Sequence, residues 1–174
     1  MIESSEKLNN QAVTLASKGQ FEEAILCFKR AITVENTNYL LWYNLGLTYR
    51  DNGDLENAKK ALNNALLLNQ DSAEVVLAVS QINFFQKDYA EALRIISIGL
   101  ENFENDENMW NLKGTILFNL SELKQACECF ENALIINPYY YDALFNLRDT
   151  YEKLGNTVGA EECSNKLKSL KKGR

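Results

Sequence analysis

The stretch from Trp42 to Ala65, WYNLGLTYRDNGDLENAKKALNNA, decides the fold of this chain. Its first half places apolar and small residues on one helical face, at Trp42, Leu45, Gly46 and Tyr49. Its second half forms another helical stripe, at Ala58, Leu62 and Ala65. Gly53 lies between the stripes, where helices commonly end on a residue with a left-handed backbone. The stretch therefore predicts two short helices joined by a tight turn.

This hairpin pattern recurs every 34 residues, so the 174 residues hold five copies after the first four positions. Alanine fills one column in every copy, at Ala24, Ala58, Ala92, Ala126 and Ala160. The copies cover residues 5–38, 39–72, 73–106, 107–140 and 141–174. Five adjacent helical hairpins predict an all-α solenoid, and we expect residues 1–174 to form a single domain of this kind.

The second and fourth copies resemble the tetratricopeptide repeat (TPR), a family of helix-turn-helix hairpins. The second copy carries the resemblance through Trp42, Leu45, Gly46, Tyr49, Gly53, Ala58, Leu62 and Ala65. The fourth copy carries it through Trp110, Gly114, Ala126, Phe130, Ala133 and Pro138. The resemblance extends over residues 5–174. It implies a right-handed α-α superhelix of five hairpins whose first helices line a concave groove.

Three copies depart from the family pattern. In the third copy Ser80 and Asn83 replace the expected small and aromatic residues, so this copy should pack less tightly. Lys87 and Ser121 stand where the third and fourth copies would have the turn glycine, although a left-handed backbone is less favourable for residues with a side chain. Arg148 replaces a small residue in the fifth copy, as suits a terminal repeat that no neighbour covers.

Composition excludes several classes of protein. There are 24 acidic and 18 basic residues, and this net charge of −6 disfavours nonspecific nucleic-acid binding. No apolar run approaches the roughly 18 residues of a membrane span, so we expect none. The first six residues, MIESSE, do not read as a signal peptide. We therefore expect a soluble, cytoplasmic chain.

The residues needed for catalysis are missing from the sequence. Histidine is absent, and we find no glycine-rich phosphate loop, no metal-ligand spacing and no nucleophile with a base partner. Cys127 and Cys129 are two residues apart and point in different directions on a helix, so we interpret them, with Cys27 and Cys163, as reduced structural thiols. We predict that the chain is not an enzyme and uses no cofactor and no metal.

The outward sides of the first helices supply the candidate binding residues. Projection away from the packing stripes selects Asn10, Tyr43, Asn44, Leu47, Leu77, Gln81, Phe84, Asn111, Phe118, Phe145 and Asn146. Asn10, Asn44 and Asn146 fall in one column, which resembles the asparagine ladder with which some family members hold a peptide backbone. Large apolar residues such as Phe84 would supply the affinity. Two alternatives stay open, because asparagine is abundant throughout the chain and Phe85 could belong to the core between repeats.

These features predict a non-catalytic adaptor that binds a peptide segment of a partner protein in the concave groove. Self-association through the C-terminal repeat is an alternative, since Leu167 and Leu170 should lie at an incompletely capped end. A role as a chaperone or regulatory subunit of a larger assembly is another. The lysine and arginine clamp with which some family members bind the C-terminal carboxylates of heat-shock chaperones is not expected, because its cationic places hold Asn9, Glu74 and Ala78.

The end of the chain is basic and allows two interpretations. From position 164 onward the charged residues are Lys166, Lys168, Lys171, Lys172 and Arg174. These cations either form a solvated helix end, where they oppose the negative end of the helix dipole, or contact an acidic partner.

Overall fold

A computed structural model describes residues 3–172 of the chain, and the described residues form ten α-helices and no strand. The helices are α1 (Ser5–Ser17), α2 (Phe21–Val34), α3 (Tyr39–Asp51), α4 (Leu55–Leu68), α5 (Ala73–Phe85), α6 (Tyr89–Asn102), α7 (Glu107–Asn119), α8 (Leu123–Ile136), α9 (Tyr141–Lys153) and α10 (Thr157–Lys172). Each predicted copy contains two helices, which confirms the all-α prediction. Met1 and Arg174, the ends of the predicted domain, lie outside the described residues.

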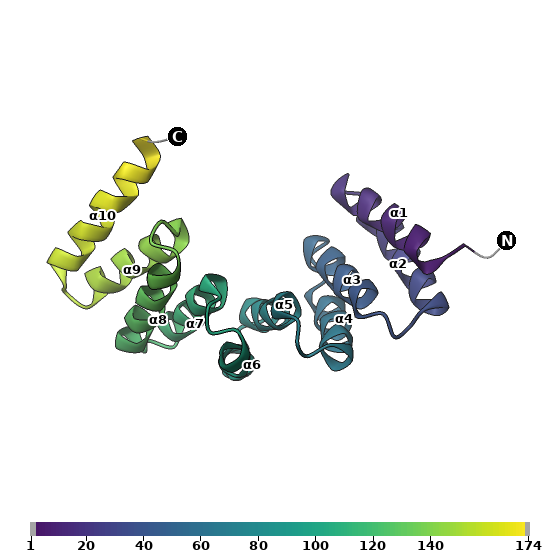
Figure 1. Cartoon of the computed structure of the whole chain (residues 1–174), viewed down its shortest axis with the longest axis horizontal. Coiled ribbons are helices and arrows are strands. Elements are labelled where there is room, and N and C mark those ends of the chain that lie inside the picture. Colours follow the sequence, from purple (N-terminus) through teal and green to yellow (C-terminus); the bar gives the residue numbers. More distant parts are fainter. Residues whose placement is uncertain (1–2, 173–174) are drawn as a thin grey trace. The chain divides into compact units, whose positions relative to one another are not determined.

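The helices belong to two compact units (Figure 1). Unit 1 is Met1–Asp88 and contains α1 to α5, and unit 2 is Tyr89–Arg174 and contains α6 to α10. The boundary therefore falls between the two helices of the third copy. Within unit 1 each helix contacts the next one along the chain, and the same holds within unit 2. The expectation of a single domain over residues 1–174 stays a prediction, and each unit is described by itself.

Side-chain caps and turns explain where the helices begin and end. Asp54 accepts a hydrogen bond from the backbone N–H of Asn57 at 3.1 Å and so caps α4, as an N-cap aspartate does. Gly53, just before it, has a φ of 81°. Lys87 and Ser121 adopt φ angles of 63° and 64° at the equivalent turns, which confirms that the turn geometry is kept where glycine is not.

In the second and fourth copies, close approach of the two helices of the hairpin depends on a glycine in the first helix. A Cβ atom on Gly46 would lie 2.6 Å from Cγ of Leu62, and one on Gly114 would lie 2.6 Å from Cε1 of Phe130. Both contacts are far shorter than ordinary van der Waals separations. The small residue is therefore what allows the large side chain of the second helix to be fully buried.

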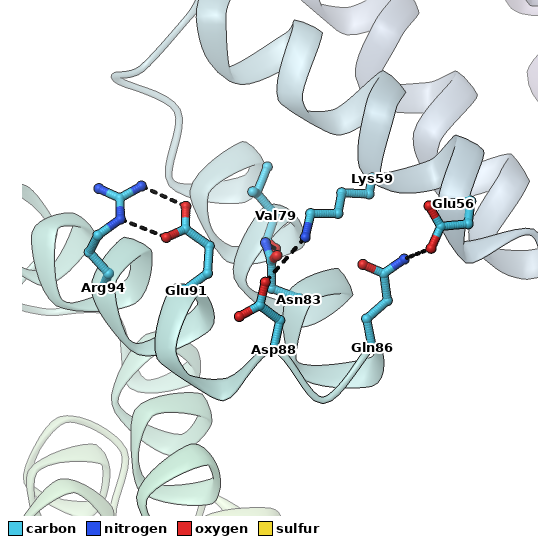
Figure 2. A network of polar contacts seen from close by, with 8 residues as sticks. All are labelled: Glu56, Lys59, Val79, Asn83, Gln86, Asp88, Glu91 and Arg94. Atoms are coloured by element: carbon cyan, nitrogen blue, oxygen red, sulfur yellow. Dashed lines mark hydrogen bonds and ion pairs between the residues drawn. The ribbon is translucent and has the colours of Figure 1, made fainter.

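The third copy carries polar side chains at buried positions, as its sequence predicts. Ser80 and Asn83 are buried in α5, and Figure 2 shows Asn83 beside Val79, whose carbonyl oxygen accepts the Asn83 Nδ2 hydrogen bond at 2.8 Å. The Oδ1 atom of Asn83 has no hydrogen-bond partner among the described residues. A buried acceptor without a partner lowers stability, so this position weakens the packing of α5.

Polar contacts between α4 and the end of α5 also appear in Figure 2. Gln86 donates a hydrogen bond from Nε2 to Oε1 of Glu56 at 2.9 Å, and Nζ of Lys59 lies 3.4 Å from Oδ2 of Asp88. These contacts are solvent-exposed, so each adds little to the free energy of unfolding. The apolar packing beneath them supplies most of the stability of unit 1.

We expect Gly114→Val to destabilise unit 2 by about 1–3 kcal/mol, because the new side chain would overlap the buried ring of Phe130. The measurement is the urea midpoint of helix loss, followed by circular dichroism. Glu128→Val, on the exposed side of α8, introduces the same side chain without the overlap and serves as the control. A midpoint that falls no further for Gly114→Val than for this control would contradict the packing assignment.

We expect Asn83→Leu to stabilise the chain by about 1–2 kcal/mol, because it removes a buried oxygen that has no partner and keeps a side chain of similar size. The measurement is the Tm and the urea midpoint. Asn83→Asp, which buries a carboxylate at the same place, should have the opposite effect. Equal stabilities of all three chains would show that water reaches Oδ1 of Asn83.

Candidate functional site

The first helices of unit 1 lie next to one another, since α3 contacts both α1 and α5. Their outward side, called the first-helix face of unit 1, carries seven of the predicted residues. Asn10 is exposed, and the other six are half-buried, namely Tyr43, Asn44, Leu47, Leu77, Gln81 and Phe84. None of the seven is fully buried, so each retains surface that a ligand can contact.

Unit 2 has an equivalent surface on α7 and α9, which contact each other. This first-helix face of unit 2 holds the remaining predicted residues: Asn111, Phe118 and Asn146 are half-buried, and Phe145 is exposed.

Asparagine side chains join neighbouring first helices in both units. Nδ2 of Asn44 in α3 donates a hydrogen bond to Oδ1 of Asn9 in α1 at 3.1 Å. In unit 2, Nδ2 of Asn146 in α9 donates to Oδ1 of Asn111 in α7 at 3.0 Å. The same bridge therefore occurs at equivalent positions of two hairpin pairs.

The bridges show that two of the three asparagines in the predicted column are already hydrogen-bonded. The prediction placed Asn10, Asn44 and Asn146 in one row of open amides, but two of them bond to the column one residue earlier. Sequence reasoning missed the acceptor role of Asn9, although Asn9 and Asn111 also fall in one column of the repeat. The amide of Asn44 still has one N–H and its carbonyl oxygen to offer a peptide backbone, whereas Nδ2 of Asn146 also donates to Oγ1 of Thr115 at 3.4 Å and leaves mainly its carbonyl oxygen.

A cleft of about 250 Å³ opens between α1 and α3. It is lined by Val13, Ala16, Ser17, Phe28, Asn44, Leu47, Thr48 and Asp51. The ring of Phe28, which is buried, reaches it from α2, and the other lining residues belong to the two first helices. Sequence reasoning selected Asn44 and Leu47 for this surface but gave no sign of a cleft, because its depth depends on how two hairpins pack.

Aromatic residues at the end of α5 extend the apolar surface of unit 1. The rings of Phe84 and Phe85 are tilted by 57° with centroids 5.9 Å apart, a favourable arrangement for an aromatic pair. Phe85 is 52% exposed, so the alternative that assigns it to the core is wrong. Burial raises the pKa of the Tyr43 phenol above its usual value, so this side chain presents a protonated hydroxyl on the first-helix face of unit 1.

Cations cover the aromatic rings of unit 2. Nζ of Lys153 lies 4.1 Å from the ring centroid of Phe118, and the guanidinium of Arg148 lies 4.2 Å from that of Phe145. Oδ1 of Asp149 is 2.6 Å from Arg148 Nη2 and holds this guanidinium in place. The first-helix face of unit 2 is therefore more charged than that of unit 1.

The C-terminal helix differs from expectation in one respect. Leu167 is buried, with 6% of its surface exposed, and Leu170 is half-buried against the same core cluster. The prediction that Leu167 lies at an uncovered end is wrong, because α10 packs this side chain inward. Lys166, Lys168 and Lys171 are exposed, as the solvated-end interpretation requires.

Residues 3–172 contain no helix that combines the length and the apolar character needed to cross a bilayer. They also contain no group of three or more histidine, cysteine, aspartate or glutamate side chains placed to hold a metal ion.

All four cysteines are free and buried. Burial raises the pKa of the Cys127 and Cys129 thiols to about 11, and it raises the pKa of Cys163 as well. These thiols are therefore protonated and shielded at neutral pH, which fits the structural role predicted for them.

We expect the native chain to react slowly with an aromatic disulfide reagent at pH 8, because all four thiols are buried and the thiols of Cys127 and Cys129, with a pKa of about 11, are almost wholly protonated there. In 6 M guanidinium chloride all four thiols should react within minutes. The measurement is the absorbance of the released thiolate over time. Rapid release of one or more equivalents from the folded chain would contradict the burial of the cysteines.

Comparison with known proteins gives consistent matches to one family. Models of the TPR repeat match residues 14–50, 49–116 and 107–140, and together they span more than half of the chain. The TPR repeat-containing protein MJ1428 of Methanocaldococcus jannaschii is 29% identical over 171 residues. This match covers 88% of the present chain but 30% of that protein, so the chain spans less than a third of the relative's length.

Solved structures share the fold at low sequence identity. MamA superimposes with a TM-score of 0.85 at 22% identity, covering 93% of this chain and 95% of MamA. YrrB, described as a TPR protein with an unusual peptide-binding site, superimposes with a TM-score of 0.74 at 22% identity, covering 92% and 82% of the two chains. These likenesses confirm the helical-hairpin fold.

Proposed function

Because the chain belongs to the tetratricopeptide-repeat family, we propose that it is a non-catalytic scaffold that binds a segment of a partner protein along its first-helix faces. Proteins of this fold are typically interaction modules, which supports a role as a scaffold. The peptide-binding site named for YrrB supports binding of a peptide segment by analogy with a protein of the same fold.

One observation carries the proposal: the cleft between α1 and α3 lies beside an asparagine that bridges the two helices. A cleft beside a fixed amide can receive a side chain and hold the neighbouring backbone at the same time. Buried apolar side chains contribute about 1.5–3 kcal/mol each, whereas a hydrogen bond adds about 0.5–1.5 kcal/mol net. Apolar contacts would therefore supply the affinity, and the asparagines would fix the register.

Two or three such anchors contribute about 3–9 kcal/mol, from which the free-energy cost of association is subtracted, so we expect weak, transient binding. Self-association through the fifth repeat has less support, because Leu167 is packed inward. A role as a chaperone or regulatory subunit of a larger assembly stays an alternative to this proposal.

We expect Asn44→Ala combined with Phe84→Ala to weaken binding of display-selected peptides at least tenfold, because one change removes a backbone contact and the other an apolar anchor. The measurement is fluorescence anisotropy with the labelled peptides, alongside circular dichroism to confirm unchanged helicity.

The control is Leu67→Ala combined with Ile135→Ala, which removes two apolar side chains from second helices. These side chains are 76% and 77% exposed, so their loss should leave peptide binding and stability unchanged. Full retention of binding in the Asn44 and Phe84 double variant would contradict the proposal for the first-helix face of unit 1.

A further inference from the structure

We propose that the cleft between α1 and α3 binds one aliphatic side chain of the partner segment and that this side chain is followed by a basic residue. The inference rests on the proposed function and names the chemistry of its ligand. It comes from the size of the cleft, the state of its polar groups and the sign of its one charged lining residue.

Size and lining select an aliphatic side chain. The cleft holds about 250 Å³, which is below the usual range of about 300–1,000 Å³ for pockets that bind whole small molecules. Val13, Ala16, Leu47 and the buried ring of Phe28 form its apolar part. A leucine- or methionine-sized group fits this lining and exchanges water contacts for apolar ones.

The hydroxyl hydrogens around the cleft are already used. Ser17 donates from Oγ to the carbonyl oxygen of Thr14 at 2.9 Å, and Thr48 donates from Oγ1 to the carbonyl oxygen of Asn44 at 2.7 Å. One of the two amide hydrogens of Asn44 is bound to Asn9. Most of the polar capacity left to a ligand therefore consists of oxygen lone pairs, which accept hydrogen bonds.

The charge of the cleft lining also favours a basic residue in the ligand. Asp51 is the charged residue of the lining, and its Oδ1 accepts a hydrogen bond from Arg50 Nε at 2.9 Å and forms an ion pair with Arg50 Nη2 at 2.8 Å. Oδ2 of Asp51 forms no hydrogen bond or ion pair within the described part of the chain. This oxygen attracts a lysine or arginine side chain and disfavours a carboxylate, and the nearby Arg50 keeps the preference modest.

The lining also favours an internal segment of the partner over its C-terminal end, which carries a carboxylate. Capture of a carboxylate requires cations or a cluster of N–H donors aimed into the site. Here the charged lining residue is acidic and the hydroxyl hydrogens point toward backbone carbonyls. An internal segment with a lysine or arginine beside its apolar anchor is the ligand that this chemistry fits.

The test uses the full chain, labelled with ¹⁵N, and three capped hexapeptides: Gly-Ser-Leu-Lys-Ser-Gly, Gly-Ser-Leu-Glu-Ser-Gly and Gly-Ser-Ser-Lys-Ser-Gly. We expect the leucine–lysine peptide to shift the amide signals of Val13, Ser17, Asn44 and Asp51. It should bind at least threefold tighter than the leucine–glutamate peptide and at least tenfold tighter than the serine–lysine peptide.

Two variants test the cleft and its charge separately. Ser17→Leu fills the cleft from an exposed position and should abolish the shifts. Ser169→Leu is its control, because Ser169 is also exposed and donates the same kind of hydrogen bond, to Lys166. Asp51→Asn keeps the shape and should make the lysine and glutamate peptides bind within a factor of two.

Equal binding of the three peptides overturns the inference. So do shifts confined to other parts of the first-helix faces, such as Gln81 or Asn146, although that result leaves the proposed function standing. Concentration-dependent self-association that Asp51→Asn abolishes would assign the cleft to a second copy instead, and would overturn the partner segment as its occupant. If the unmodified chain binds neither these hexapeptides nor display-selected peptides on either first-helix face, both proposals are overturned.

Discussion

In the second and fourth copies, the contact between a glycine in the first helix and a large side chain in the second is the constraint on which the hairpin depends. A Cβ atom at Gly46 or Gly114 would lie 2.6 Å from the side chain of Leu62 or Phe130, so the glycine lets the helices come close enough to bury these side chains completely. With these side chains buried, neighbouring first helices also approach one another. The first-helix faces therefore depend on packing on the opposite side of the same helices.

The asparagine bridges show how closely the surface depends on that packing. Asn44 reaches Asn9, and Asn146 reaches Asn111, because adjacent first helices have the same relative offset in both units. An amide already held by a hydrogen bond would lose less rotational freedom on binding the proposed peptide, so less of the binding free energy would be spent on ordering it. The bridge thus prepares the surface as well as joining the hairpins.

The hairpins could be predicted from the sequence because their signals are local. The 34-residue period, the alanine column and the turn positions each concern residues close along the chain, and the weak third copy was visible in Asn83. The cleft and the choice of Asn9 as acceptor depend on the offset between two hairpins, which no local pattern encodes. Leu167 was misplaced for the same reason, since its burial depends on how α10 packs against the core.

The left-handed turns at Lys87 and Ser121 have a consequence for how the chain tolerates mutation. A residue with a side chain costs about 1 kcal/mol more than glycine in this conformation, and both turns are exposed. The chain thus functions with two small, separable defects that a single substitution each could repair. Such reserves let a protein accept a destabilising change at its binding surface and recover stability elsewhere, so partner preference can diverge while the scaffold persists.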